Sequence, residues 1–273
     1  TPWDISSGVS FETYFNVGDQ TSNAVALQFS ADGTKMYSAG YSSDYVTEWD
    51  LAKAFDLANV TSTIGPEFNN LEGLTIDSSD NIVVVDKGDA EIVKLSQTGT
   101  VLLNVTGFTA PRDVAIDTSG NIYATEANSG NVTKLDSSGT QLWSIGGNGT
   151  ADGKFDEPSG IDIDASGNVY IADTENNRLQ KIDSDGEFLN KFDASDGDGL
   201  SSPTGLAIKD DGTIIVAEST GDEIEEIQTT AIFETSYGNA TYGDFTVEAG
   251  PKEVVLPDVS ANSTVFEIKI QTD

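Results

Sequence analysis

The sequence predicts an all-β protein built from repeated four-stranded units, and three observations support that prediction. An apolar strand, a polar turn and a second apolar strand recur five times along the chain. The turns follow one another at intervals of about 40 to 47 residues, at Gly33, Asp80, Gly120, Gly167 and Gly212. No stretch has a sustained helical period. Repeats of this length and content are typical of β-propeller blades.

Each repeat has the same order of elements. The two-strand phrase occupies residues 27–37, 74–84, 114–124, 161–171 and 206–216. Its turns carry Asp, Asn and Gly, which tolerate the positive φ of a tight hairpin. The second strand is apolar on both faces, as in residues 82–85, because a blade is covered by a neighbour on each side. A third strand follows at 45–50, 91–96, 131–136, 178–183 and 223–228, and a less regular fourth strand comes after it.

The number of blades depends on how the ring closes. The last repeat, at 203–228, supplies three strands, and the apolar stretch 9–17 precedes the first inner strand. Joining the two completes a five-bladed propeller over residues 1–230 and leaves no open sheet edge. The alternative is six blades, with residues 231–273 as a divergent sixth.

Residues 231–273 have a different pattern and are predicted to form a small C-terminal β appendage. Residues 264–271 alternate apolar and polar side chains, as a half-buried strand does, and 244–250 and 252–258 are its expected partners. So few residues make a weak independent core. We expect this segment to hold copies of the protein together or to fix them to a larger assembly.

The repeats resemble the NHL family. Residues 146–183 are similar to a complete NHL unit, including its join at 152–160 and its turn at 172–178. The resemblance is strong over 111–218 and fainter over 24–110. It implies an NHL-type β-propeller, but such propellers serve enzymes, receptors and scaffolds, so the fold alone does not give the function.

Composition excludes several kinds of site and partner. Thirteen Lys and Arg stand against 46 Asp and Glu, and the only arginines, Arg112 and Arg178, cannot form a nucleic-acid-binding patch. No segment has the roughly 20 apolar residues of a membrane span. The absence of Cys and His removes disulfides, thiolate sites and the usual general base.

Three charged residues are candidate ligand-binding groups. Glu72, Arg112 and Asp113 stand at the starts of neighbouring inner strands, where they are expected to ring the central channel. Binding of a polar ligand is one interpretation, and a structural ion pair at a blade junction is the other. Asp162 stands where other inner strands have Gln28, Thr75 or Ala, so it is a candidate buried acid.

Four carboxylates are candidate ligands for a hard cation such as calcium. They follow the second strands and are expected on one rim of the ring: Asp86, Glu126, Asp173 and Glu218. The alternative is that each acid organises the turn that follows it, as Asp173 would with Asn177. The acidic loop 193–199 lacks the spacing of a calcium loop. Apart from such a structural cation, no cofactor is expected.

Asn-x-Ser/Thr sequons are candidate glycosylation sites of an exported protein. The sequence has six of them, at Asn59, Asn104, Asn131, Asn148, Asn239 and Asn262.

The N-terminal residues 1–57 resemble repeats found in tailed-virus structural proteins, through segments such as Trp3-Asp4-Ile5 and the phrase at 27–37. With the acidic composition, this resemblance implies a virion surface protein of a haloarchaeal tailed virus, such as a capsid turret, a decoration protein or a tail attachment part. Such a protein is not an enzyme, forms homo-oligomers, contacts other virion proteins and binds a host surface protein or glycan. The alternative is a secreted haloarchaeal hydrolase, a metal-dependent lactonase of the SMP-30-like type, for which Glu72 and Asp113 match only part of the metal set.

The net charge of −33 predicts a fold that depends on high salt. Dense like charge strains a compact chain, and near 1 M salt the Debye length falls to about 3 Å. We expect the melting temperature to rise with KCl from 0.1 to 3 M and the fold to loosen below about 0.5 M. A melting temperature that stays constant across this series contradicts adaptation to salt.

Overall fold

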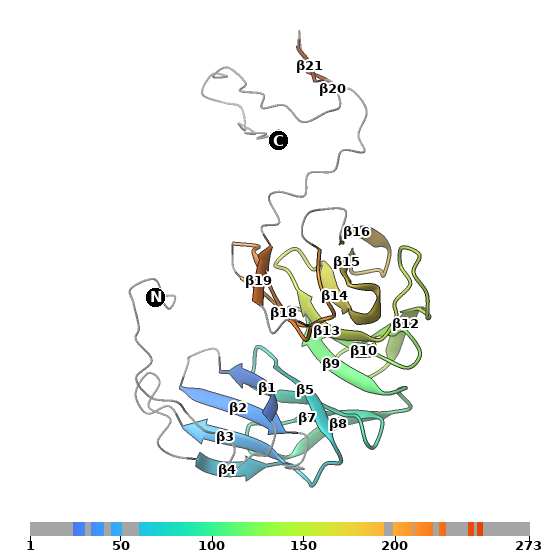
Figure 1. The fold of residues 1–273 in the computed structure, drawn as a ribbon. Coiled ribbons are helices and arrows are strands. Elements are labelled where there is room, and N and C mark those ends of the chain that lie inside the picture. The colour runs from blue at the N-terminus through green and yellow to red at the C-terminus, as the bar shows by residue number, and fades with distance from the viewer. Residues whose placement is uncertain are drawn as a thin grey trace, which may run out of the picture.

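The chain folds as a five-bladed β-propeller, which confirms the predicted all-β class and the preferred number of blades (Figure 1). The computed structural model describes residues 24–30, 34–40, 45–50, 60–193, 199–209, 211–220, 224–227, 240–242 and 245–247. In that part of the chain, four blades have four antiparallel strands and the fifth blade has three. None of the helices in these residues is long and apolar enough to cross a membrane.

The strands of each blade follow one another from the channel outward. Blade 1 has β1 (Ala24–Phe29), β2 (Lys35–Gly40), β3 (Val46–Asp50) and β4 (Val60–Ile64). Blade 2 has β5 (Leu71–Ile76), β6 (Ile82–Asp86), β7 (Glu91–Leu95) and β8 (Val101–Thr106). Blade 3 has β9 (Pro111–Ile116), β10 (Ile122–Glu126), β11 (Asn131–Leu135) and β12 (Gln141–Gly146). Blade 4 has β13 (Pro158–Ile163), β14 (Val169–Asp173), a 3-10 turn (Thr174–Asn176), β15 (Arg178–Ile182) and β16 (Phe188–Phe192). Blade 5 has β17 (Pro203–Ile208), β18 (Ile214–Glu218) and β19 (Ile224–Ile227).

The core consists of apolar layers between successive blades. Strand β6 illustrates the arrangement: Val84 packs in the layer shared with blade 1, whereas Val83 and Val85 pack in the layer shared with blade 3. All three are fully buried, and burying such a side chain contributes about 1.5–3 kcal/mol. The predicted strands with two apolar faces are therefore confirmed.

Two glycines allow neighbouring inner strands to approach closely. A Cβ atom on Gly73 in β5 would lie 2.7 Å from the Cα atom of Asp113 in β9. A Cβ atom on Gly160 in β13 would lie 2.7 Å from the carbonyl oxygen of Thr204 in β17. A side chain at either position would push two blades apart, so these glycines set the width of the channel wall.

One hydrogen bond recurs in blades 2 to 5. A carboxylate at the end of the second strand accepts it from a backbone N–H 17 residues earlier, just before the inner strand. The residue after that N–H has positive φ in all four blades. The four pairs are Asn69–Asp86 at 2.7 Å, Thr109–Glu126 at 2.8 Å, Asp156–Asp173 at 2.7 Å and Ser201–Glu218 at 3.0 Å. We call this contact the carboxylate tie.

The chain ends mostly lie outside the described residues. The stretch 9–17 is among them, so closure of the ring by the N-terminal strand stays a prediction. In the tail, β20 (Ala240–Tyr242) pairs with β21 (Phe245–Val247), which falls within the predicted strand 244–250. Residues 252–258 and 264–271 are not described, and the role of the tail in assembly stays a prediction.

Blade 4 neutralises its buried carboxylate with an arginine. Asp173 is fully buried and accepts hydrogen bonds from Arg178 Nε at 2.7 Å and from the side chains of Asn176 and Gln180. The guanidinium also donates to the carbonyl oxygens of Thr150, Ala151 and Lys154, and so pins the loop that precedes the blade.

Replacing this arginine is expected to destabilise the fold strongly. Arg178→Met leaves the Asp173 carboxylate buried without its cation, which costs about 3–5 kcal/mol. Arg112→Met removes the same charge from a partly exposed pair and should cost about 1 kcal/mol or less. Denaturant unfolding of both variants in high salt measures the difference. Equal losses of stability would contradict this account of blade 4.

Candidate functional site in the central channel

The five inner strands surround a cavity of about 790 Å³. Its walls combine apolar side chains, such as Leu74, Ile161 and Leu206, with polar groups from all five strands. These polar groups include Gln28 on β1, Glu72 on β5, Arg112 and Asp113 on β9, Ser159 and Asp162 on β13, and Thr204 on β17. A cavity of this size and mixed lining is typical of a small-molecule site.

Asp113 is held rigidly in the channel wall. Its Oδ1 atom accepts a hydrogen bond from the N–H of Val114 at 2.9 Å, and its Oδ2 atom accepts one from the N–H of Ile161, in the next blade, at 3.1 Å. Burial raises the pKa of the Asp113 carboxyl to about 7, and the negative charges of Asp162 and Glu72 contribute to the increase. Near neutral pH both the protonated and the ionised forms of this carboxyl are therefore populated.

Asp162 repeats this geometry one blade further on. Its Oδ1 atom accepts a hydrogen bond from the N–H of Ile163 and its Oδ2 atom accepts one from the N–H of Ile208, both at 2.8 Å. Burial also raises its pKa. Asp162 is half-buried in the channel wall, and with Asp113 it joins three consecutive inner strands through carboxylate-to-backbone hydrogen bonds.

The three predicted ligand-binding residues all line one cavity, but two of them form ion pairs with residues outside its lining. Glu72 binds Lys87 of its own blade, with 2.6 Å between Oε1 and Nζ. Arg112 reaches across to blade 4, with 2.7 Å between Nη2 and Glu157 Oε2, while its buried Nε has no hydrogen-bond partner. Both the channel position and the ion pair at a blade junction are present, and ligand binding by these residues stays a prediction.

The four predicted metal ligands sit in four different blades. Each makes the carboxylate tie of its own blade, in agreement with the organising role that we considered as the alternative. Asp173 accepts hydrogen bonds from the side chains of Asn176 and Arg178, and not from Asn177 as predicted. The side-chain oxygen of Asn177 instead accepts a hydrogen bond from the N–H of Ser202 in the next blade.

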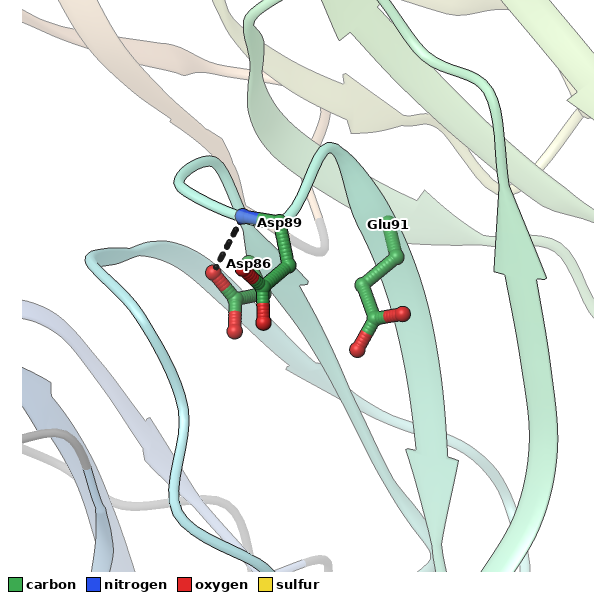
Figure 2. A group of neighbouring side chains, drawn as sticks. All are labelled: Asp86, Asp89 and Glu91. Carbon is green, nitrogen blue, oxygen red and sulfur yellow. Dashed lines mark hydrogen bonds between the residues drawn. The ribbon is translucent and has the colours of Figure 1, made fainter.

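One acidic group around Asp86 was missed in the sequence. Within the described residues, Asp86, Asp89 and Glu91 form a group whose carboxylate oxygens lie within 4.8 Å of one another (Figure 2). Asp89 and Glu91 stand where blade 4 has Asn176 and Arg178, so blade 2 lacks the neutralising arginine. Burial, followed by the charges of Asp89 and Glu91, raises the pKa of Asp86. Asp86 is buried, Asp89 is exposed and Glu91 is partly buried, and a structural cation at this group stays a prediction.

The described sequons differ in exposure. Asn104 lies exposed on the outermost strand β8, and Asn148 is exposed but donates a hydrogen bond to the carbonyl oxygen of Asn128. Asn131 begins β11 and is partly buried. Asn59, Asn239 and Asn262 lie outside the described residues, and glycosylation at any of the six stays a prediction.

Comparisons with known proteins support the repeat type and the fold. The NHL repeat model matches residues 155–182. No curated protein matches the chain. A selenomethionine-substituted virginiamycin B lyase from Staphylococcus aureus is similar in structure, with a TM-score of 0.60 and 17% identity, over 78% of this chain and 72% of that one. A streptogramin B lyase structure has a TM-score of 0.59 and 19% identity, over 77% and 70%. A catalytically inactive histidine-to-alanine variant of the S. aureus enzyme, with quinupristin, has a TM-score of 0.56 and 15% identity, over 75% and 69%.

These structures correct the prediction that the chain is not an enzyme. The three solved structures named above are lyases, and at 15–19% identity they share the fold with this chain rather than a demonstrated activity. The prediction rested on the resemblance of residues 1–57 to tailed-virus proteins, on an incomplete set of metal ligands and on the absence of His and Cys. An aspartate whose burial raises its pKa to about 7 has the acid–base properties usually supplied by histidine.

The raised pKa of Asp113 predicts a specific dependence of stability on pH. Because this pKa lies above the unfolded value of 3.8, the fold favours the neutral carboxyl. Its contribution to stability is complete below pH 3.8 and is lost as the pH rises through about 7. Between pH 5 and 7 the loss is expected to approach about 1.4 kcal/mol per pH unit.

Denaturant unfolding from pH 5 to 8 tests this dependence. Asp113→Asn should lack this pH dependence of stability. Asp117→Asn should retain it, because Asp117 lies just after the same strand and hydrogen bonds lower its pKa despite its burial. If the free energy of unfolding of Asp113→Asn falls with pH as steeply as that of the wild type, the titrating group is a different residue.

Proposed function

We propose that the chain is a secreted hydrolase of the lactonase type and that the channel cavity is its active site. The proposal rests on the position and the pKa of Asp113. This residue is a rigidly held carboxylate in the wall of the cavity, it ionises near neutral pH, and no cation of the described residues lies within 4.0 Å of it. Such a group is suited to general acid–base catalysis.

The similarity to lyases supports an active site in this fold, but not the same chemistry. One of those structures is a histidine-to-alanine variant described as catalytically inactive, and this chain has no histidine. A different residue must move protons here. Among the described groups of the cavity, Asp113 is the one whose pKa is raised to about 7.

The proposed reaction begins when the Asp113 carboxylate removes a proton from water. The hydroxide attacks the carbonyl carbon of a lactone, and the ring carbon–oxygen bond breaks. Asp113 then returns the proton to the leaving oxygen, so the products are a hydroxy acid and the unchanged enzyme. The guanidinium of Arg112 lines the cavity and can donate to a developing oxyanion, whereas the hydroxyl groups of Ser159 and Thr204 already donate to the carbonyl oxygens of Thr204 and Ala217.

The geometry favours a mechanism in which no metal is held by the channel carboxylates. Glu72, Asp113 and Asp162 line one cavity, but in the part of the chain that the structure describes their oxygens do not form a group close enough to share an ion. The proposed reaction therefore uses no ion shared by these three carboxylates.

The comparisons give no support to a virion component. Much of the N-terminal segment that resembles tailed-virus proteins lies outside the described residues. An extracellular, high-salt location remains part of the proposal and rests on the charge of −33.

Turnover of a panel of lactones in 3 M KCl tests the proposal. Asp113→Asn should lower kcat/KM by about 10²- to 10⁴-fold, the usual contribution of a general base. Asp117→Asn, outside the cavity and just after the same strand, should leave kcat/KM within about threefold of the wild-type value. Activity in the wild type that persists in Asp113→Asn would contradict the assignment of the base, and no turnover of any lactone would contradict the function.

A further inference from the structure

The charged groups of the channel cavity are not balanced. Four charged residues line it: Glu72, Arg112, Asp113 and Asp162. Glu72 is neutralised by Lys87 and Arg112 by Glu157. Strands β1 and β17 contribute uncharged polar groups, Gln28 and Thr204. Within the described residues this leaves Asp113 and Asp162 without a cation, on adjacent inner strands and in one cavity.

Both carboxylates are fixed as acceptors. Each oxygen of Asp113 and Asp162 takes one backbone N–H, and a carboxylate oxygen has a second lone pair that remains available. Because the backbone of two neighbouring blades holds each group, neither carboxylate can swing out to solvent as a surface acid does. The acceptors are therefore organised before any ligand arrives.

An uncompensated charge in a partly dehydrated wall is unfavourable unless it gains a partner. The charge of Asp162 disfavours ionisation of Asp113, which shows that the two groups act on each other. A cation placed between them would remove this penalty and would favour the ionised form of Asp113. That form is the one required of a general base.

We propose that the ligand of this cavity carries a protonated amine, which Asp113 and Asp162 bind. The proposal rests on the proposed function only in calling this ligand a substrate, which would then be an ester or lactone with an ammonium group. The apolar side chains Leu74, Ile161 and Leu206 in the same wall fit the carbon skeleton of such a compound.

Calorimetry with a matched pair of probes tests the inference without turnover. The probes are 1,5-diaminopentane, which is charged, and 1,5-pentanediol, which has the same length and no charge. At pH 6 and constant KCl we expect the diamine to bind at least about tenfold more tightly, because a hydrogen bond to a charged group is stronger than one between neutral groups. In two buffers with different ionisation enthalpies, binding should also release a proton as Asp113 ionises.

Three variants distinguish diamine binding in the channel from diamine binding to the acidic surface. Asp113→Asn should weaken diamine binding and abolish the proton release, and Asp162→Asn should weaken binding while the release persists. Asp117→Asn should change neither, since it lies outside the cavity. Diamine binding that survives in both channel variants would be binding to surface charge and would overturn the proposal.

Other outcomes are also decisive. Equal affinity for the two probes, or no binding of either, would overturn the inference. Selective binding of the diamine with no hydrolysis of any lactone would support the inference and contradict the proposed hydrolase, so the two failures are distinguishable.

Discussion

The carboxylate tie is the contact on which the arrangement of the channel depends. In blades 2 to 5 it joins the end of the second strand to the N–H group 17 residues earlier. The inner strand starts two residues after that N–H, following a residue held at positive φ. The tie therefore sets where each inner strand begins. Glu72, Arg112, Ser159 and Thr204 all lie at the second position of their inner strands and so reach the channel at equivalent places.

The carboxylate of the tie has different side-chain neighbours in different blades, so the charge around it varies from blade to blade. In blade 4 the carboxylate of Asp173 also binds Arg178, and in blade 3 Glu126 accepts a hydrogen bond from the hydroxyl of Thr133. In blade 2 the neighbours of Asp86 are themselves acids. The fold needs the backbone hydrogen bond in every case, but the charge around it varies. The inner-strand positions that face the channel are less constrained, and there Asp113 and Asp162 replace the small or uncharged residues of other blades.

Much of the fold was predictable from the sequence because the repeat is local. Turn residues and strands with two apolar faces, such as 82–85, are recognisable within one blade, and the five copies give the number of blades. The position of Glu72, Arg112 and Asp113 at the channel followed from the direction of the strands. The contacts of the site did not follow, because Asp113 and Asp162 bind N–H groups 48 and 46 residues away, in the next blade.

One ground of the wrong prediction about enzymatic function, the absence of His and Cys, failed for a similar reason. Counting His and Cys treats acid–base capacity as a property of residue types, whereas burial and neighbouring charges determine the pKa of a carboxyl group. Glu72 and Asp113 are both acids at the channel, yet one is paired with Lys87 and the other has no cation beside it among the described residues. That difference appears only when the blades are brought together.

The central claim is that the channel holds a carboxyl group that ionises near neutral pH. Direct titration of the Asp113 side chain tests it, by ¹³C NMR of protein labelled at the aspartate carboxyl carbon, with the resonance assigned by its loss in Asp113→Asn. The structure predicts a midpoint at about 7 in high salt. A midpoint near the ordinary aspartate value of 3.8 would show a solvated surface acid and would contradict the account.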